Sequence, residues 1–240
     1  MKIYVGLCSS PSKKGYFNFF DAVEIQETFY TVPSETKAKN LKNKTQDLND
    51  FYLFLKAPQH ITHPFNSSTY KRSKKDYGKR ENYGFFKDTE EVDLAWKDIK
   101  CFATASGAKG IVFQTPSSFN ETEENIKNIK NFFKDKDGLL FFWECRGKWK
   151  SETLRKIYSD LRIYQAVDPF HQEVLMYDFV YLRLHGRIMY RYKFENKDFE
   201  EIVDLIKKSK GYVFVMFNNI YMWEDAIKFK EFITEKGIYG

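Results

Sequence analysis

The sequence predicts an α/β fold, a (β/α)8 TIM-like barrel of eight parallel strands. Eight short runs rich in β-branched and aromatic residues recur along the 240 residues, and stretches with helical periodicity separate them. A chain of this length with this alternation is typical of a closed barrel. A doubly wound sheet would usually show fewer strands and a glycine-rich turn after the first strand.

The expected strands cover residues 2–7, 22–26, 51–56, 110–114, 139–144, 163–166, 179–184 and 212–217. The clearest helix between them runs from Val92 to Ala103, where apolar residues recur every three or four positions until Gly107 ends the pattern. Asn120 and Glu123 resemble a capping box that opens the next helix. Further helical stripes cover residues 126–133, 154–161 and 199–206.

The composition excludes several classes of protein. Hydrophobic residues make up 42% of the chain and aromatic residues 18%, which excludes a disordered protein. The longest strongly apolar run, from Leu139 to Trp143, is too short to span a bilayer, and the first residues lack a signal-peptide pattern. The 3 cysteines fit neither a disulfide framework nor a zinc site. We therefore expect a single cytoplasmic domain over residues 1–240, without a membrane partner.

One strongly basic segment, residues 66–88, interrupts the alternation of strands and helices. Tyr70, Tyr77 and Tyr83 are interspersed among its basic residues, Lys71, Arg72, Lys74, Lys75, Lys79 and Arg80. A run of charges is usually a solvated loop, so we interpret the segment as an insertion after the third strand, near the rim of the barrel. The alternative is a nucleic-acid-binding arm, in which tyrosines stack on bases and cations contact phosphates.

Polar side chains stand at the carboxyl ends of nearly all the expected strands. A buried charge is costly unless it is paired, so such a pattern needs a cause. In a barrel these strand ends meet at one mouth, where the active sites of this fold lie. We therefore predict one charged, hydrogen-bonding pocket. Its residues, in strand order, are Glu24, Gln26, Thr28, Lys56, Gln114, Glu144, Arg146, Asp168, Arg183, His185, Asn218 and Asn219.

Seven segments of the chain carry a family likeness: AVEIQETFYTVPS, FLKAPQHITHP, IVFQTPSSFNETEENI, WECRGKW, VDP, FVYLRLHGR and VFVMFNN. In order and spacing they resemble the signature segments of the YecE-like family, the domain of unknown function numbered 72. The resemblance spans nearly the whole chain. It implies a TIM barrel with a deep polar pocket at the carboxyl ends of its strands and an unassigned activity. It implies that the family's recurrent residues are here Glu24, Thr28, Phe29, Tyr30, Lys56, Ala57, Pro58, Thr62, His63, Gln114, Pro116, Glu144, Arg146, Trp149, Asp168, Arg183, His185, Gly186, Asn218 and Asn219.

The expected pocket mixes cations with carboxylates, and this mixture favours an anionic ligand. Arginine can bind an anion through paired hydrogen bonds while a carboxylate serves as general base. We predict a hydrolase-type enzyme acting on a phosphate-bearing or other anionic substrate, with an anion such as phosphate or sulfate in the pocket. The predicted catalytic residues are Glu144, His185, Asp168 and Glu24. The predicted substrate-binding residues are Lys56, Arg146, Arg183, Gln114, Asn218, Asn219, His63 and Tyr30.

Other functions remain open at this point. Glu24 and Glu144 could form the carboxylate pair of a glycosidase, but neighbouring cations would hold both ionised, whereas a general acid needs a raised pKa. A divalent cation could bind Glu24, Glu144, Asp168 and His185; the same cations disfavour it, and we predict no metal site. Cys8 is a candidate nucleophile, although such a cysteine is more often a small buried residue. The non-catalytic alternative is nucleic-acid binding through the basic insertion.

Overall fold

The computed structural model describes residues 1–238, apart from the side chain of Met189. Its strands follow chain order around a closed barrel, β1 to β8, which confirms the predicted fold class. Each strand begins and ends within one residue of its expected position. The strands are β1 (Lys2–Leu7), β2 (Ala22–Ile25), β3 (Tyr52–Lys56), β4 (Gly110–Gln114), β5 (Leu140–Glu144), β6 (Tyr164–Val167), β7 (Phe179–Leu184) and β8 (Tyr212–Phe217).

Helices alternate with these strands. Within the described residues, no helix has both the length and the apolarity that crossing a membrane requires. The α-helices are α1 (Tyr16–Phe19), α2 (Glu35–Thr45), α3 (Gln59–Thr62), α4 (Glu90–Ser106), α5 (Glu123–Phe133), α6 (Ser151–Leu161), α7 (Asn196–Ile206) and α8 (Met222–Glu235). Single turns of 3-10 helix are η1 (Glu27–Phe29), η2 (Ser68–Arg72), η3 (Arg80–Asn82) and η4 (Met189–Arg191).

The predicted cap of α5 was wrong. The N-cap is Thr122, whose hydroxyl accepts a hydrogen bond from the Asn125 amide at 3.1 Å. The Asn120 side chain instead accepts a bond from the Lys148 amide at 2.9 Å and so ties together the loops after β4 and β5. A tertiary partner therefore determines the role of Asn120, and local spacing does not reveal such a partner.

The chain divides into two compact units. Unit 1 contains Met1–Glu24 and the chain from Tyr164 onward, and unit 2 contains Ile25–Ile163. The single domain expected from the sequence stays a prediction. Within each unit, the recorded strand pairings are parallel.

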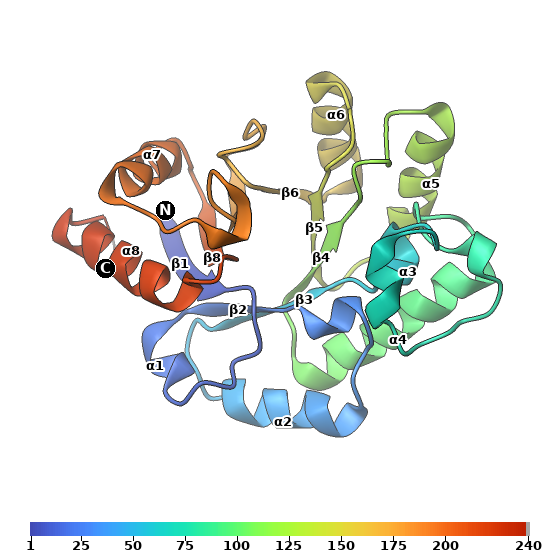
Figure 1. The fold of residues 1–240 in the computed structure, drawn as a ribbon, viewed down its shortest axis with the longest axis horizontal. Helices are drawn as coiled ribbons and strands as arrows, with labels where there is room; N and C mark the ends of the chain where they lie inside the picture. Colours follow the sequence, from blue (N-terminus) through green and yellow to red (C-terminus); the bar gives the residue numbers. More distant parts are fainter. Residues whose placement is uncertain (239–240) are drawn as a thin grey trace. The chain divides into compact units, whose positions relative to one another are not determined.

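In unit 1, the strands pair in the order β6, β7, β8, β1 and β2. Helix α8 packs on β1 and β8 and contacts α7 (Figure 1). Aromatic side chains fill the interior near the amino ends of the strands. The Phe214 ring stacks on Tyr4 at 5.0 Å and on Phe179 at 5.5 Å between ring centroids. Because aromatic rings fill the amino ends of these strands, the polar residues are left for the carboxyl ends.

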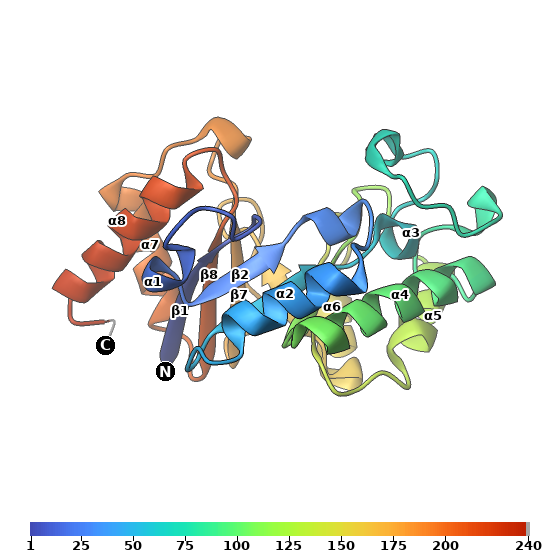
Figure 2. The same ribbon diagram turned by 90° about the horizontal axis from the view of Figure 1, so that it is seen from below.

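In unit 2, β3, β4 and β5 pair side by side, and α2 lies along α4 (Figure 2). The helices α4 and α5 bury aromatic residues against β4 and β5. The Phe113 ring lies 5.0 Å from Phe133 and 5.6 Å from Phe132, while Trp96 lies 5.9 Å from Phe141. The helical stripes seen in the sequence are therefore the buried faces that hold these strands in place.

The basic insertion has an aromatic centre of its own. The buried His60 ring meets Tyr70, Tyr77 and Tyr83 edge-on, with ring centroids 4.8 to 5.3 Å apart. His60 Nε2 bonds the Lys75 carbonyl oxygen at 3.2 Å. The six basic residues from Lys71 to Arg80 are exposed, as a solvated loop requires, whereas Tyr83 is 2% exposed. The insertion is thus a folded segment in which the tyrosines pack inward on His60 and the basic side chains are left in solvent.

Candidate functional site

The carboxyl ends of the strands carry three polar clusters, two in unit 1 and one in unit 2. The Glu24 cluster contains Cys8, Glu24, Tyr181 and Arg183. The His185 cluster contains Asp168, His185 and Asn218. The His63 cluster contains Lys56, His63, Gln114, Glu144 and Arg146. The single opening shared by all predicted residues stays a prediction.

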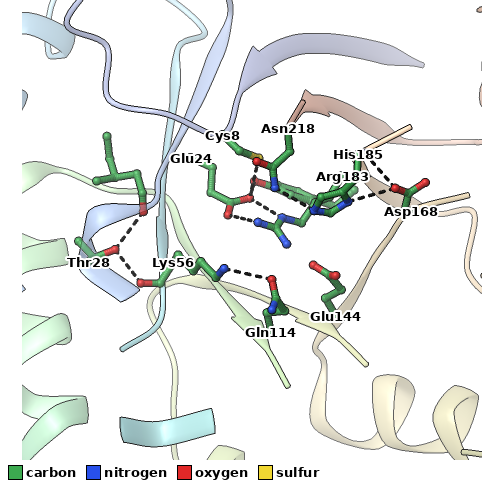
Figure 3. A network of polar contacts seen from close by, with 12 residues as sticks. Cys8, Glu24, Thr28, Lys56, Gln114, Glu144, Asp168, Arg183, His185 and Asn218 are labelled. Atoms are coloured by element: carbon green, nitrogen blue, oxygen red, sulfur yellow. Dashed lines mark hydrogen bonds and ion pairs between the residues drawn. The ribbon is translucent and has the colours of Figure 1, made fainter. Parts of the chain in front are cut away.

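The Glu24 cluster is a fully buried ion pair. The Arg183 guanidinium grips Glu24 with two bonds, Nε to Oε2 at 3.0 Å and Nη2 to Oε1 at 2.9 Å, and both side chains are 0% exposed (Figure 3). The Tyr181 hydroxyl also donates to Glu24 Oε2 at 3.0 Å. A carboxylate that accepts this many hydrogen bonds is fixed in place. These contacts favour a structural role for Glu24 and Arg183 over the predicted catalytic and substrate-binding roles.

Cys8 completes this cluster as a protonated thiol. Its Sγ lies 3.4 Å from Glu24 Oε2. Burial raises the pKa of the Cys8 thiol well above its usual value, and the negative charge of Glu24 raises it further. Because the thiolate is the nucleophilic form, this environment disfavours Cys8 as a nucleophile. The glycosidase alternative is disfavoured as well, since it needs Glu24 for chemistry.

Tyr181 is a member of this cluster that sequence reasoning missed. It stands two residues before Arg183 on β7, so the two side chains point to the same side of the strand. That spacing was the available signal. In a run of aromatic strand residues, a tyrosine is nevertheless normally interpreted as a packing residue. Only the tertiary structure shows that the Tyr181 hydroxyl bonds a carboxylate.

The His185 cluster is an oriented carboxylate–imidazole pair. Asp168 Oδ2 accepts bonds from the His185 amide at 2.9 Å and from His185 Nδ1 at 3.1 Å. Because a carboxylate only accepts, Nδ1 carries a proton, and Nε2 is left to accept from the Asn218 amide nitrogen at 3.0 Å. Figure 3 shows this relay from Asp168 to Asn218. The arrangement fixes the tautomer and ring plane of His185, as a general base requires.

Asn219 lies apart from this relay. Its amide nitrogen donates to the Tyr192 carbonyl at 2.8 Å and to Asp225 Oδ2 at 2.6 Å, and the residue is 1% exposed. It therefore ties the loop after β7 to the start of α8. These contacts favour a structural role over the predicted substrate-binding role.

The His63 cluster gathers side chains from the ends of β3, β4 and β5 in unit 2. Lys56 Nζ donates to Gln114 Oε1 at 3.0 Å (Figure 3). Gln114 stands opposite Glu144 in the register of β4 and β5. Arg146 Nε donates to Glu144 Oε1 at 2.6 Å, and the Arg146 side chain is 32% exposed. Strand register therefore places an amide, a carboxylate and two cations together.

His63 reports the electrostatics of this cluster. Burial lowers the pKa of His63 to about 3, and the positive charges of Lys56 and Arg146 lower it further, against the opposing effect of Glu144. The Nδ1 atom shares a hydrogen bond with the Thr62 hydroxyl at 2.8 Å. The imidazole is therefore neutral at physiological pH, and the potential around it is positive.

Backbone and ring contacts hold this cluster in place. The Thr28 hydroxyl donates to the Lys56 carbonyl oxygen at 2.6 Å, while Lys56 Nζ lies 4.2 Å above the centre of the Phe29 ring. Gly84 crosses the His63 backbone so closely that a Cβ would lie 2.3 Å from the His63 carbonyl carbon. Only glycine fits there, at a φ of 82°. The end of the insertion thus braces His63.

Tyr30 forms hydrogen bonds with residues of the insertion rather than with residues of the His63 cluster. Its hydroxyl accepts from Arg72 Nη1 at 2.8 Å, and the Arg72 guanidinium lies 4.1 Å from the centre of its ring. The Ser73 hydroxyl donates to the Tyr30 carbonyl oxygen at 3.0 Å.

Among residues 1–238, no three histidine, cysteine or carboxylate side chains come together as a metal site.

We predict that Glu24→Gln destabilises the fold by about 3–5 kcal/mol, because it leaves the buried Arg183 guanidinium without its counter-charge. Urea unfolding followed by circular dichroism measures the change. Glu35→Gln, at an exposed carboxylate, is the control and should shift the free energy of unfolding by less than about 0.5 kcal/mol. Equal effects of the two changes would contradict a structural role for the pair.

We predict that His63 makes the protein less stable as the pH falls. The folded state keeps His63 neutral down to a pKa of about 3, whereas the unfolded chain binds the proton at a pKa of about 6.5. The unfolded state therefore gains protons between these values, and the free energy of unfolding falls through that window. Relative to His63→Asn, the wild type should lose about 2 kcal/mol between pH 7 and pH 5. Parallel pH profiles in urea unfolding would disprove this.

The comparisons with known proteins agree with this architecture. A DUF72 family protein from Thermotoga maritima MSB8 superposes with a TM-score of 0.68 at 21% identity, covering 98% of this chain and 100% of that one. A second, from Enterococcus faecalis V583, has a TM-score of 0.71 at 17% identity, covering 100% and 98%. A xylose isomerase domain containing protein from Salmonella typhimurium LT2 has a TM-score of 0.54 at 13% identity, covering 96% and 94%.

At these identities, the likenesses show the shared barrel fold alone. No protein with a curated description matches the chain in sequence. Residues 12–236 match the family described as "Protein of unknown function DUF72". That match covers nearly the whole chain and agrees with the resemblance of the seven segments, so the chain belongs to the DUF72 family.

Proposed function

We propose that this protein is a hydrolase-type enzyme that acts on an anionic, phosphate-bearing substrate bound at the His63 cluster. The observation that carries the proposal is the joint placement of two cations: Lys56 Nζ bonds Gln114, Gln114 stands opposite Glu144 in the strand register, and Arg146 bonds Glu144. The neutral His63 imidazole adds no charge to this cluster. A phosphate group brought to this position would meet a positive potential and two kinds of nitrogen donor.

The same cluster holds a group that can move a proton. Glu144 is 3% exposed, and its Oε1 accepts a hydrogen bond from Arg146 Nε. An ionised carboxylate in a site that excludes bulk water can accept a proton from an attacking water molecule. Lys56 and Arg146 would then stabilise the charge that develops on the phosphoryl oxygens.

His185 is a second candidate for proton transfer. Asp168 orients the His185 imidazole and keeps the proton on Nδ1. Nε2 is therefore unprotonated and accepts a hydrogen bond from Asn218. This is the geometry that general acid–base catalysis requires of a histidine. The hydrogen bond from Asn218 would have to open before Nε2 could take a proton.

We expect Glu144→Gln to lower kcat on a phosphate-ester substrate by about 100-fold, because it removes the base and keeps the size of the side chain. Lys56→Gln should raise KM instead, since it removes a cation that binds the substrate. A panel of phosphate monoesters and diesters, assayed by phosphate or alcohol release, identifies the substrate. Glu35→Gln and Lys39→Gln, exposed positions on α2, are the matched controls. Activity that survives both Glu144→Gln and His185→Ala would remove these residues from the mechanism.

The non-catalytic alternative, nucleic-acid binding through the insertion, is supported by its exposed cations. The six basic residues from Lys71 to Arg80 are exposed. Two of them already have acidic partners, since Lys75 bonds Asp98 at 3.1 Å and Arg80 bonds Asp76 at 3.3 Å. The tyrosines pack around His60 instead of presenting their faces. Binding of this kind would therefore rest on phosphate contacts and show little stacking.

If the insertion binds single-stranded nucleic acid, removing its cations should reduce the salt dependence of binding. The triple change Lys71→Gln, Lys74→Gln and Lys79→Gln should reduce the slope of log K against log salt by about 2, since each phosphate contact contributes about 0.7. Fluorescence anisotropy with a labelled oligonucleotide measures the slope. Three exposed lysines of other helices, Lys127, Lys134 and Lys156, changed to Gln serve as the control. An identical slope in both triple variants would reject the arm.

A further inference from the structure

Two loops of unit 1 expose an apolar surface. Ile188 and Ile220 are 73% and 60% exposed, and Tyr190 and Tyr221 are 45% and 38% exposed. The Ile220 amide donates to the Tyr190 carbonyl oxygen at 2.8 Å, which holds the loops after β7 and β8 together (Figure 2). We name these four residues the Ile188 patch. Large apolar side chains gathered in this way mark a surface that binds something.

Positive charge predominates beside the patch. Residues 8–20, 186–194 and 218–223 contain no aspartate or glutamate, and Asp21, Glu195 and Glu224 directly follow these three segments. Their cations are Lys13, Lys14, Arg187, Arg191 and Lys193. Lys193 Nζ lies 5.7 Å from the centre of the Tyr221 ring, and Lys13 Nζ lies 4.0 Å from that of Trp223 at the start of α8. Arg187 is paired with Asp198 at 2.8 Å and with Glu201 at 2.5 Å. The positive charge beside the patch therefore comes from Lys13, Lys14, Arg191 and Lys193, and it favours a partner with negative charge.

The kind of apolar residue narrows the choice of partner. A second copy of this chain would bring cations against cations. A nucleic-acid strand stacks on flat aromatic faces, whereas the two most exposed members of the patch are isoleucines, which have none. Aliphatic side chains that enter the acyl region, tyrosines at the headgroup level and flanking lysine and arginine are the combination found in proteins that lie on anionic membranes.

We propose that the Ile188 patch docks this protein on the surface of an anionic lipid membrane. Such a contact needs no spanning helix, whereas the expectation of no membrane partner rested on the lack of a spanning segment. The Tyr190 ring packs edge-on against His185 with 5.2 Å between centroids. Docking through the patch would therefore hold the His185 cluster close to the lipid headgroups.

Vesicle sedimentation tests the proposal. The protein should bind vesicles of equal parts phosphatidylcholine and phosphatidylglycerol, and it should bind phosphatidylcholine vesicles much more weakly. Ile188→Ser with Ile220→Ser should weaken binding to the anionic vesicles at least about tenfold, because two buried side chains are lost from the acyl region. Arg191→Gln with Lys193→Gln should weaken it about tenfold and flatten its dependence on salt.

The controls match the chemistry of each change at other places. Leu94→Ser removes a 37%-exposed apolar side chain from α4, and Lys127→Gln with Lys156→Gln removes two exposed charges from α5 and α6. These variants should bind as the wild type does, and thermal melts confirm that all are folded. Absence of vesicle binding, equal binding to neutral vesicles, or equal losses in controls and patch variants would overturn the proposal. Loss of oligonucleotide binding in the patch variants, without vesicle binding, would also overturn it and assign the patch to nucleic acid.

Discussion

A buried pair of opposite charges constrains unit 1 more than any other contact. Glu24 and Arg183 are both 0% exposed, so bulk water solvates neither charge. Each must find its full set of partners inside the protein, and Tyr181 and Cys8 complete the set around the carboxylate. The carboxyl ends of β1, β2 and β7 therefore have one compatible arrangement. Such a pair adds little net stability over an apolar core, and its effect is to specify the packing.

The three polar clusters differ in their balance of positive and negative side chains. In the Glu24 cluster, bidentate bonds and a hydroxyl leave a rigid, compensated interior. In the His63 cluster, burial and then the charges of Lys56 and Arg146 keep the imidazole neutral. The two cations of this cluster outnumber its one carboxylate, Glu144. A cluster whose charges balance supports the structure of a site, whereas a cluster with excess positive charge attracts an anionic ligand. This contrast is why we place substrate binding at His63 and not at Arg183.

The loops show two ways of using aromatic residues. In the insertion, tyrosines turn inward onto His60 and donate hydrogen bonds to carboxylates, as the Tyr77 hydroxyl does to Asp98 Oδ2 at 2.7 Å. A segment of this length gains order only if it packs a centre of its own. In the loops after β7 and β8, the isoleucines and tyrosines of the Ile188 patch instead face water. The first arrangement stabilises a loop, and the second leaves a surface for a partner.

The sequence by itself determined the strands, the main helices and the polar residues at the strand ends. Those features follow from local periodicity, since a strand that buries both faces and a helix that buries one stripe record it in adjacent residues. The tertiary structure alone decided which polar groups meet. That Tyr181 and Arg183 both reach Glu24, that Asn120 bonds a distant amide, and that the insertion's tyrosines turn inward depend on register and on contacts between residues far apart in the chain. The spacing of residues along a sequence does not reveal these contacts, because each side chain bonds the group that lies next to it in the folded structure.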